Sequence, residues 1–200
     1  MVADSIVEIR RLTGEDLQRE LPALARLRIE VFRDFPYLYE GSMDYEQKYL
    51  EVYLRSSRCA MIAAYDQQRI VGAASALPLS DENDYVQEPF LHAGYDLKRI
   101  FYFGESVLLP SYRGQGLGHA FFDRREEVAR SYGDYDITCF CAVQRSERHP
   151  QRPSSYRSLE SFWTKRGYAS RAELQAEFTW RDVGDQKETA KKMTYWLKEW

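Results

Sequence analysis

The chain has 200 residues, of which 44% are hydrophobic, a length and composition that can bury one core and favour a single domain over residues 1–200. Its 28 basic and 31 acidic side chains are mixed along the sequence and leave a formal net charge of −3, which argues against nucleic acid as a partner. Three cysteines are too few for a disulfide or zinc scaffold, and no apolar run approaches the roughly 20 residues of a membrane span, so we expect a cytoplasmic protein without metal.

Apolar residues spaced three or four apart predict helices, and short apolar runs bounded by polar turns predict strands. The first half of the chain is predicted to form a strand over 6–12, helices over 15–32 and 45–54, and strands over 59–65, 70–77 and 100–109. Residues 66–69 are short enough to close a hairpin. Gly104 lies inside the last of these strands, where an interior glycine indicates a bulge or a close backbone approach.

The second half is predicted to form a helix over 114–132, a strand over 137–143, a helix over 156–166 that stops at Gly167, and strands over 174–180 and 192–197. Strand 137–143 is apolar almost throughout, as expected for a strand covered on both faces. Polar segments over 80–98 and 144–155 interrupt the pattern. This order predicts an α/β (α+β) fold, a mixed sheet with helices on both faces.

Three alternating glycines, Gly114, Gly116 and Gly118, lie between strand 100–109 and the helix that follows. Such a junction directs unpaired backbone N–H groups and the positive end of a helix dipole to one place. Glycine leaves room for a bulky anion to reach the amides and tolerates positive φ. The sequence therefore predicts an anion site, of the kind that holds a diphosphate.

Two common phosphate-binding patterns do not fit this turn. A P-loop requires Lys and then Ser or Thr after its last glycine, but His119 and Ala120 follow Gly118. A dinucleotide fingerprint requires GxGxxG, and here the third glycine comes one residue early. The first alternative is rejected on residue identity and the second on spacing.

Arg113 with Gly116 and Gly118 forms the signature RxxGxG, which resembles motif A of the GNAT acetyltransferase superfamily. The segment 162–168 looks like the family's late helix end, and segments 31–39, 103–106 and 140–143 look like a bacterial subgroup. The resemblance covers essentially the whole chain. It implies the GNAT fold, a mixed, mostly antiparallel twisted sheet flanked by helices on both faces.

The same resemblance implies that acetyl-CoA is the cosubstrate. In the family, a bulged strand bonds the pantetheine arm and the following turn holds the pyrophosphate. The corresponding coenzyme-binding residues here are Val107 and Leu108 for pantetheine and, at the turn, Arg113, Gly114, Gln115, Gly116, Leu117, Gly118 and His119.

Acetyl transfer needs a neutral acceptor amine, yet a lysine-like amine with a pKa near 10.4 is protonated at neutral pH. A base is therefore expected. Glu105 is the candidate because it directly precedes the pantetheine-binding segment, where several family members place an acid or a histidine. The alternative is a strand carboxylate paired with a nearby arginine.

The leaving thiolate in this family is often protonated by a tyrosine four residues before the helix-ending glycine, but that position holds Trp163. Because an indole donates no useful acid proton, Tyr156 or solvent has to serve. Tyr156 also stands where many relatives carry an Asn that contacts CoA. The alternative for Tyr156 is an aromatic side chain packed on the core.

Two further segments bear on the acceptor. The loop 145–153 holds three arginines and one histidine, which would suit an acceptor with an acidic group or the CoA 3′-phosphate; the alternative is a solvated surface loop. The aromatic segment 35–39 follows the first helix, in a region that often caps the acceptor site in this superfamily. It either selects the substrate or packs on the sheet.

These residues predict an acetyl-CoA-dependent N-acetyltransferase that acetylates a primary amine of a small molecule or peptide. The expected partners are acetyl-CoA and the amine, with no nucleic acid and no membrane, and a homodimer is possible. The alternative function is a non-catalytic module that senses acyl-CoA on the same fold. Trp163 favours the sensor, and Glu105 favours the enzyme.

Overall fold

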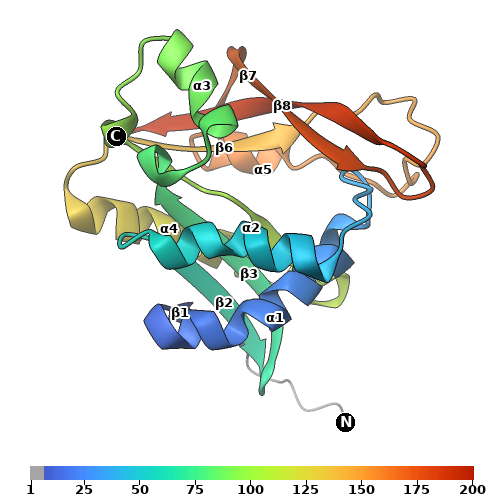
Figure 1. Ribbon diagram of the computed structural model, residues 1–200, viewed down its shortest axis with the longest axis horizontal. Helices are drawn as coiled ribbons and strands as arrows, with labels where there is room; N and C mark the ends of the chain where they lie inside the picture. The colour runs from blue at the N-terminus through green and yellow to red at the C-terminus, as the bar shows by residue number, and fades with distance from the viewer. Residues whose placement is uncertain (1–6) are drawn as a thin grey trace.

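The computed structural model describes residues 7–200 (Figure 1). Its α-helices are α1 (Gly14–Phe32), α2 (Met43–Arg55), α3 (Asp84–His92), α4 (Leu117–Tyr132) and α5 (Glu160–Lys165). Its strands are β1 (Glu8–Leu12), β2 (Ala60–Asp66), β3 (Arg69–Pro78), β4 (Ile100–Tyr102), β5 (Ser106–Leu108), β6 (Ile137–Val143), β7 (Ala169–Arg181) and β8 (Glu188–Glu199). Ile6, the first residue of the predicted strand 6–12, lies outside the described residues.

The strands form one sheet in the order β1-β2-β3-β4-β6-β8-β7, with β5 paired to β3 beside this path. Only β4 and β6 run parallel among the pairings of the described chain, and every other pair is antiparallel. The predicted mixed, mostly antiparallel sheet is therefore confirmed. The parallel pair requires a crossover, which α4 supplies.

Helices cover both faces of the sheet, as predicted. Helices α1 and α2 lie on one face, and α4 lies on the other (Figure 1). Helix α5 joins the α4 face, because Phe122 of α4 meets Phe162 of α5 edge-on, with ring centroids 5.6 Å apart. Within residues 7–200, no helix has both the length and the apolar character to span a bilayer.

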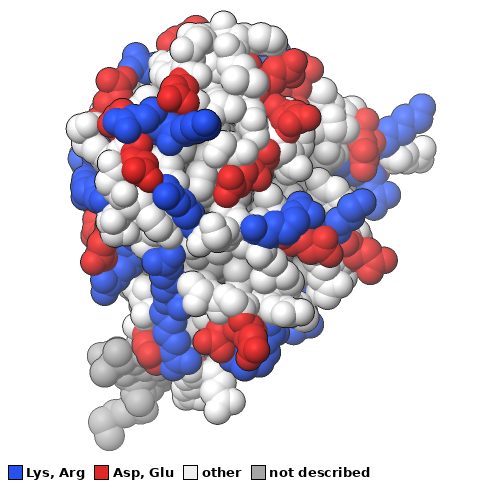
Figure 2. Space-filling model, turned by 60° about the vertical axis from the view of Figure 1, so that its left-hand side comes forward, with Lys and Arg blue, Asp and Glu red and all other residues white. Residues whose placement is uncertain are grey.

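Charges of the two signs are mixed on one face of the molecule. Figure 2 shows basic and acidic side chains interspersed on the face that it draws. This distribution follows from the mixed charge pattern of the sequence, and it gives that face no extended field of one sign to attract a polyanion.

The predicted strand 100–109 is wrong as a single element, because it divides into β4 and β5 around residues 103–105. The N–H of Phe103 makes the last bond toward β6, to the carbonyl of Cys139 at 2.7 Å. Beyond it the chain bends, and β5 pairs with β3 alone among the described strands. The sheet therefore opens between β5 and the second half of β6.

Three other predicted elements have different limits. The polar segment 80–98 contains α3, whose Val86 and Phe90 are buried one turn apart. Helix 156–166 begins only at Glu160, and in the loop before it the Ser158 hydroxyl accepts a hydrogen bond from the N–H of Glu160 at 3.2 Å. Strands β7 and β8 extend well beyond the predicted 174–180 and 192–197 as a long hairpin whose far end is exposed.

Candidate active site

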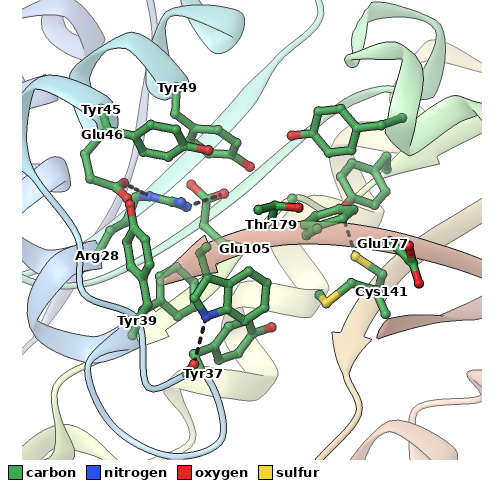
Figure 3. A pocket seen from close by; sticks show the side chains of 17 residues that line it. Arg28, Tyr37, Tyr39, Tyr45, Glu46, Tyr49, Glu105, Cys141, Glu177 and Thr179 are labelled. Atoms are coloured by element: carbon green, nitrogen blue, oxygen red, sulfur yellow. Dashed lines mark hydrogen bonds and ion pairs between the residues drawn. The ribbon is translucent and has the colours of Figure 1, made fainter. Parts of the chain in front are cut away.

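A cavity of about 350 Å³ lies beside the bend between β4 and β5. It is bounded by α1, the segment after α1, α2, α3, the bend itself and strands β4, β6, β7 and β8 (Figure 3). The residues that line it are Arg28, Phe32, Tyr37, Tyr39, Tyr45, Glu46, Tyr49, Tyr85, Tyr102, Gly104, Glu105, Cys141, Glu177, Phe178, Thr179, Trp180 and Met193.

Glu105, the predicted base, projects into this cavity (Figure 3). Its Oε2 lies 2.8 Å from Nη1 of Arg28, so the carboxylate does pair with an arginine. The guanidinium of Arg28 also pairs with Glu46, which is fully buried. One cation thus lies between two buried carboxylates. Removing any one of the three charges would leave a buried charge less well compensated and would lower stability.

Hydroxyl groups also hold the carboxylate, at the oxygen that Arg28 contacts. The Tyr53 hydroxyl donates to Oε2 of Glu105 at 3.1 Å, and the Ser75 hydroxyl donates to Tyr53 at 2.7 Å. A Cβ at Gly104 would lie only 2.0 Å from the Tyr53 oxygen. Gly104 is therefore the close approach that its place in the strand predicted, and it lets Tyr53 reach the base.

Arg125 of α4 fixes the bend from beneath, and the sequence analysis missed it. It is almost fully buried, and its guanidinium donates to the Glu105 carbonyl at 3.2 Å and to the Ser106 hydroxyl at 2.8 Å. Burial lowers the pKa of Arg125 to about 10. Its position on the buried face of a long helix resembles that of any core residue, so only the fold reveals its role.

Glu82 is a second carboxyl that the sequence did not single out. It is 6% exposed, and its Oε1 has no hydrogen-bond partner within residues 7–200. Burial raises the pKa of Glu82 to about 7, hydrogen bonds from Asn83 oppose that shift, and the charge of Glu105 adds to it. Its burial and the nearby charge of Glu105 arise only in the folded chain, so no spacing in the sequence could have marked it.

Cys141 lines the cavity but is not a nucleophile. Burial raises the pKa of its thiol to about 12, and its sulfur lies 3.2 Å from the Tyr102 hydroxyl. Since a thiolate is the reactive form, Cys141 acts as a small apolar surface. Among the described residues, no three His, Cys, Asp or Glu side chains gather as metal ligands would.

The glycine turn forms an elbow between β5 and α4, and we call residues 113–119 the elbow. Gly114 and Gly116 have φ of 76° and 83°, the left-handed region that favours glycine, and Gly116 is the N-cap of α4. From Gly114 to His119, no backbone N–H donates to a partner within residues 7–200. A Cβ at Gly114 or Gly116 would meet nothing within 4 Å, so open space lies beside the backbone at both glycines.

The side chains of the elbow brace it rather than fill it. Arg113 Nε donates to the Leu108 carbonyl at 3.1 Å, and Gln115 Nε2 donates to the Ser111 carbonyl at 3.1 Å. The His119 ring packs edge-on against Phe162, with centroids 4.8 Å apart. These contacts leave the amides of the elbow available for an anion.

Strand β5 presents one edge to the opening in the sheet. Val107 pairs with Ala73 in the antiparallel register. On either side of this pair, the Ser75 N–H donates to the Glu105 carbonyl and the Leu109 N–H donates to the Val71 carbonyl. In such a ladder the backbone groups of alternate residues point to opposite sides. The N–H of Leu108 therefore faces the opening, whereas the backbone of Val107 is directed to β3 and its side chain is buried.

Tyr156 lies in the loop before α5 and outside the residues that line the cavity. Its ring meets Phe35 edge-on at 4.7 Å, and the guanidinium of Arg152 lies 5.0 Å from its centroid. Burial raises its pKa. Trp163 packs between Phe140 and Trp196 on the sheet, with centroids 5.0 and 5.1 Å away.

The two other segments singled out in the sequence lie in different environments. Tyr37 and Tyr39 of segment 35–39 line the cavity. Arg145 is committed to structure, because it pairs with Asp182 at 2.8 Å and donates to the Tyr37 carbonyl at 2.7 Å. No residue of loop 145–153, Arg145 included, lines the cavity.

A mixed sheet that opens beside a glycine elbow, with a carboxylate at the opening, defines the architecture of a coenzyme-dependent acyltransferase. The sequence model of the acetyltransferase (GNAT) family matches residues 24–152, and the chain belongs to this family, whose members use acetyl-CoA. No curated protein matches the sequence.

Solved structures share the fold at low identity. A ribosomal-protein-alanine N-acetyltransferase from Brucella melitensis superimposes with a TM-score of 0.62 at 13% identity, over 96% of this chain and 99% of that chain. A GNAT-family acetyltransferase from Streptococcus pneumoniae gives 0.60 at 13%, over 97% and 99%. The PaiA N-acetyltransferase from Thermoplasma acidophilum, in complex with coenzyme A, gives 0.55 at 14%, over 98% and 99%. At these identities the likeness shows the fold alone.

Proposed function

We propose that this chain is an acetyl-CoA-dependent N-acetyltransferase that acetylates a primary amine of a small molecule or peptide in the cavity beside Glu105. The observation that carries the proposal is the continuity of the site. Glu105 lines the cavity, and the next residue, Ser106, begins the strand that leads to the elbow. An amine in the cavity and a coenzyme on the elbow would thus meet at the bend.

Glu105 is the base in this proposal. Its contacts with Arg28 and Tyr53 are both made at Oε2, and no hydrogen bond reaches Oε1 within residues 7–200. The first oxygen is held in place, while the second is available to take a proton from an ammonium group. Removing that proton exposes the lone pair that attacks a carbonyl, because an ammonium ion has none.

The elbow and β5 hold the coenzyme in this proposal. The free amides from Gly114 to His119 bind the diphosphate at the N-terminus of α4, and the Leu108 N–H bonds the pantetheine arm. The coenzyme supplies an acetyl thioester, and no protein side chain becomes acetylated. A backbone N–H at the open edge of β5 near the carbonyl would stabilise developing negative charge by about 3 kcal/mol.

Tyr156 donates the proton that the leaving thiolate takes up in this proposal, since Trp163 cannot. Tyr168 is nearer to Trp163 in sequence, but its hydroxyl is buried and bonded to Thr138 and Glu126, whereas Tyr156 lies in the loop before α5. Replacing Tyr156 with Phe is expected to lower kcat about tenfold or more, with the coenzyme Kd unchanged. An unchanged kcat would assign this proton to solvent.

The second candidate function is a coenzyme-binding module without catalysis, favoured by the indole of Trp163 where relatives carry a phenol. One pair of measurements separates the two. Thiol release from acetyl-CoA with a library of amines supports the enzyme. Thermal stabilisation by CoA without thiol release for any amine supports the module, and no stabilisation by CoA would reject both.

A further inference from the structure

The cavity beside Glu105 has a wall made mainly of aromatic rings. Nine of its 17 lining residues are aromatic: Phe32, Tyr37, Tyr39, Tyr45, Tyr49, Tyr85, Tyr102, Phe178 and Trp180. They come from helices, strands and the segment after α1, so the rings surround the space from several sides (Figure 3). Ring faces carry partial negative charge, and they accept flat or apolar groups as well as cations.

The charged residues of the wall are mostly acidic. Two buried carboxylates, those of Glu46 and Glu105, line the cavity together with one guanidinium, that of Arg28, and the exposed Glu177 lies at its rim. Arg28 is already shared by Glu46 and Glu105, and it lies 4.3 Å from the Tyr49 ring centroid. The cavity therefore has a net negative lining and already holds one cation against an aromatic face.

A substrate carboxylate or phosphate would find no free cation in this wall. Arg28 is the single basic residue among the lining residues, and both of its neighbours are acidic. Arg145 of loop 145–153, which bonds the carbonyl of the lining residue Tyr37, is occupied by Asp182 and backbone carbonyls. An anion in the cavity would also face Glu105 at short range, which costs free energy.

We propose that the acceptor is a small organic cation with an apolar or aromatic body and no acidic group, such as an arylalkylamine or an aliphatic diamine. This inference rests on the proposed acetyl transfer in the same cavity. The ammonium group approaches the free Oε1 of Glu105, and the body of the molecule packs on the tyrosine faces. Both contacts favour a cation over a zwitterion.

The test compares amines that differ by one group. Binding of 2-phenylethylamine and of phenylalanine, which adds only a carboxylate, is measured by calorimetry with CoA present, and thiol release is measured in parallel. We expect 2-phenylethylamine to bind at least about tenfold more tightly. Equal or tighter binding of phenylalanine would overturn the inference. A third arm with 1,4-diaminobutane tells an aromatic acceptor from a diamine.

The binding measurement separates this inference from the proposed function. Cation binding without thiol release would support the acceptor class and reject catalysis. Thiol release with an amino acid or a short peptide, but with neither cationic amine, would support catalysis and reject the acceptor class. Binding of none of these amines in the presence of CoA would likewise reject the acceptor class.

A charge reversal at the rim provides a matched control. Glu177 and Glu173 are both exposed on β7, but only Glu177 lines the cavity. Glu177→Lys is expected to raise the Kd of 2-phenylethylamine about threefold to tenfold, whereas Glu173→Lys changes it less than twofold. Equal effects of the two variants would mean that the cavity does not select a cation. Both side chains are exposed, so neither variant threatens folding.

Discussion

The elbow and the cavity present different kinds of chemical group to a ligand. The elbow offers backbone amides of consecutive residues, and its glycines matter because they have no side chain to cover those amides. The cavity uses side chains from helices, strands and loops that are far apart in the sequence. A shared coenzyme needs only the backbone site, while the side-chain site is free to differ between members of one fold.

The two regions also differ in electrostatic sign. The elbow offers N–H groups and the positive end of α4 to an anion, whereas the cavity lining has an excess of carboxylates. Only a few residues separate the two regions in the chain, because Glu105 directly precedes β5 and a short turn leads from β5 to Arg113. This arrangement would keep an anionic coenzyme and a cationic acceptor on separate sides of the bend.

The largest effect is expected on the cavity side. Glu105→Gln removes the proton acceptor and should lower kcat roughly 10² to 10⁴-fold, with CoA binding intact. Turnover is measured by thiol release between pH 6 and 9, and CoA binding by calorimetry. Turnover that stays unchanged across that pH range would exclude Glu105 as the base.

Glu46→Gln controls for the loss of an ion pair. Like Glu105, Glu46 is buried and pairs with Arg28, so each variant leaves Arg28 with one carboxylate. We expect Glu46→Gln to lower stability by a similar amount and to weaken acceptor binding, with kcat within about tenfold of the parent. Equal losses of kcat would mean that Arg28, rather than the base, controls the rate.

On the elbow side, Gly116→Ala is expected to weaken CoA binding roughly 100-fold, because a Cβ would stand in the open space beside the free amides. Gly133→Ala is the matched control. Gly133 ends the same helix with φ of 73°, and a Cβ there also meets no atom within 4 Å. Both variants carry the same backbone strain of about 1 kcal/mol, so only the first should lose CoA affinity. Equal CoA affinity of the two variants would show that the elbow does not hold the coenzyme.

The smallest effect concerns the buried charge beside the cavity. Burial raises the pKa of Glu82 from its ordinary 4.5 to about 7, so ionisation opposes folding. The stability that the protonated form contributes is complete below pH 4.5 and is lost as the pH rises through 7. Glu82→Gln, which cannot ionise, should therefore gain about 2 kcal/mol over the parent between pH 5 and pH 8. Denaturant unfolding at both pH values measures this gain, and a constant difference would contradict it.

Several features of the fold were predictable because their signals are local. The period of α1, the hairpin of β2 and β3, and strand β6 depend on neighbours within a few residues. Gly104 signalled a close approach, but the sequence did not show that the chain would leave β6 there. That break depends on Tyr53 and Ser75, which reach the glycine from α2 and β3.

The sequence by itself determined the elbow, since glycine spacing at the start of a helix fixes where unpaired amides lie. It also named Glu105, which stands next to the elbow in the chain. Only the tertiary structure showed Arg28 between two carboxylates, Glu82 buried, and nine rings around one cavity. The physical reason is that backbone geometry follows from adjacent residues, whereas the environment of a side chain is set by elements that meet only when the chain folds.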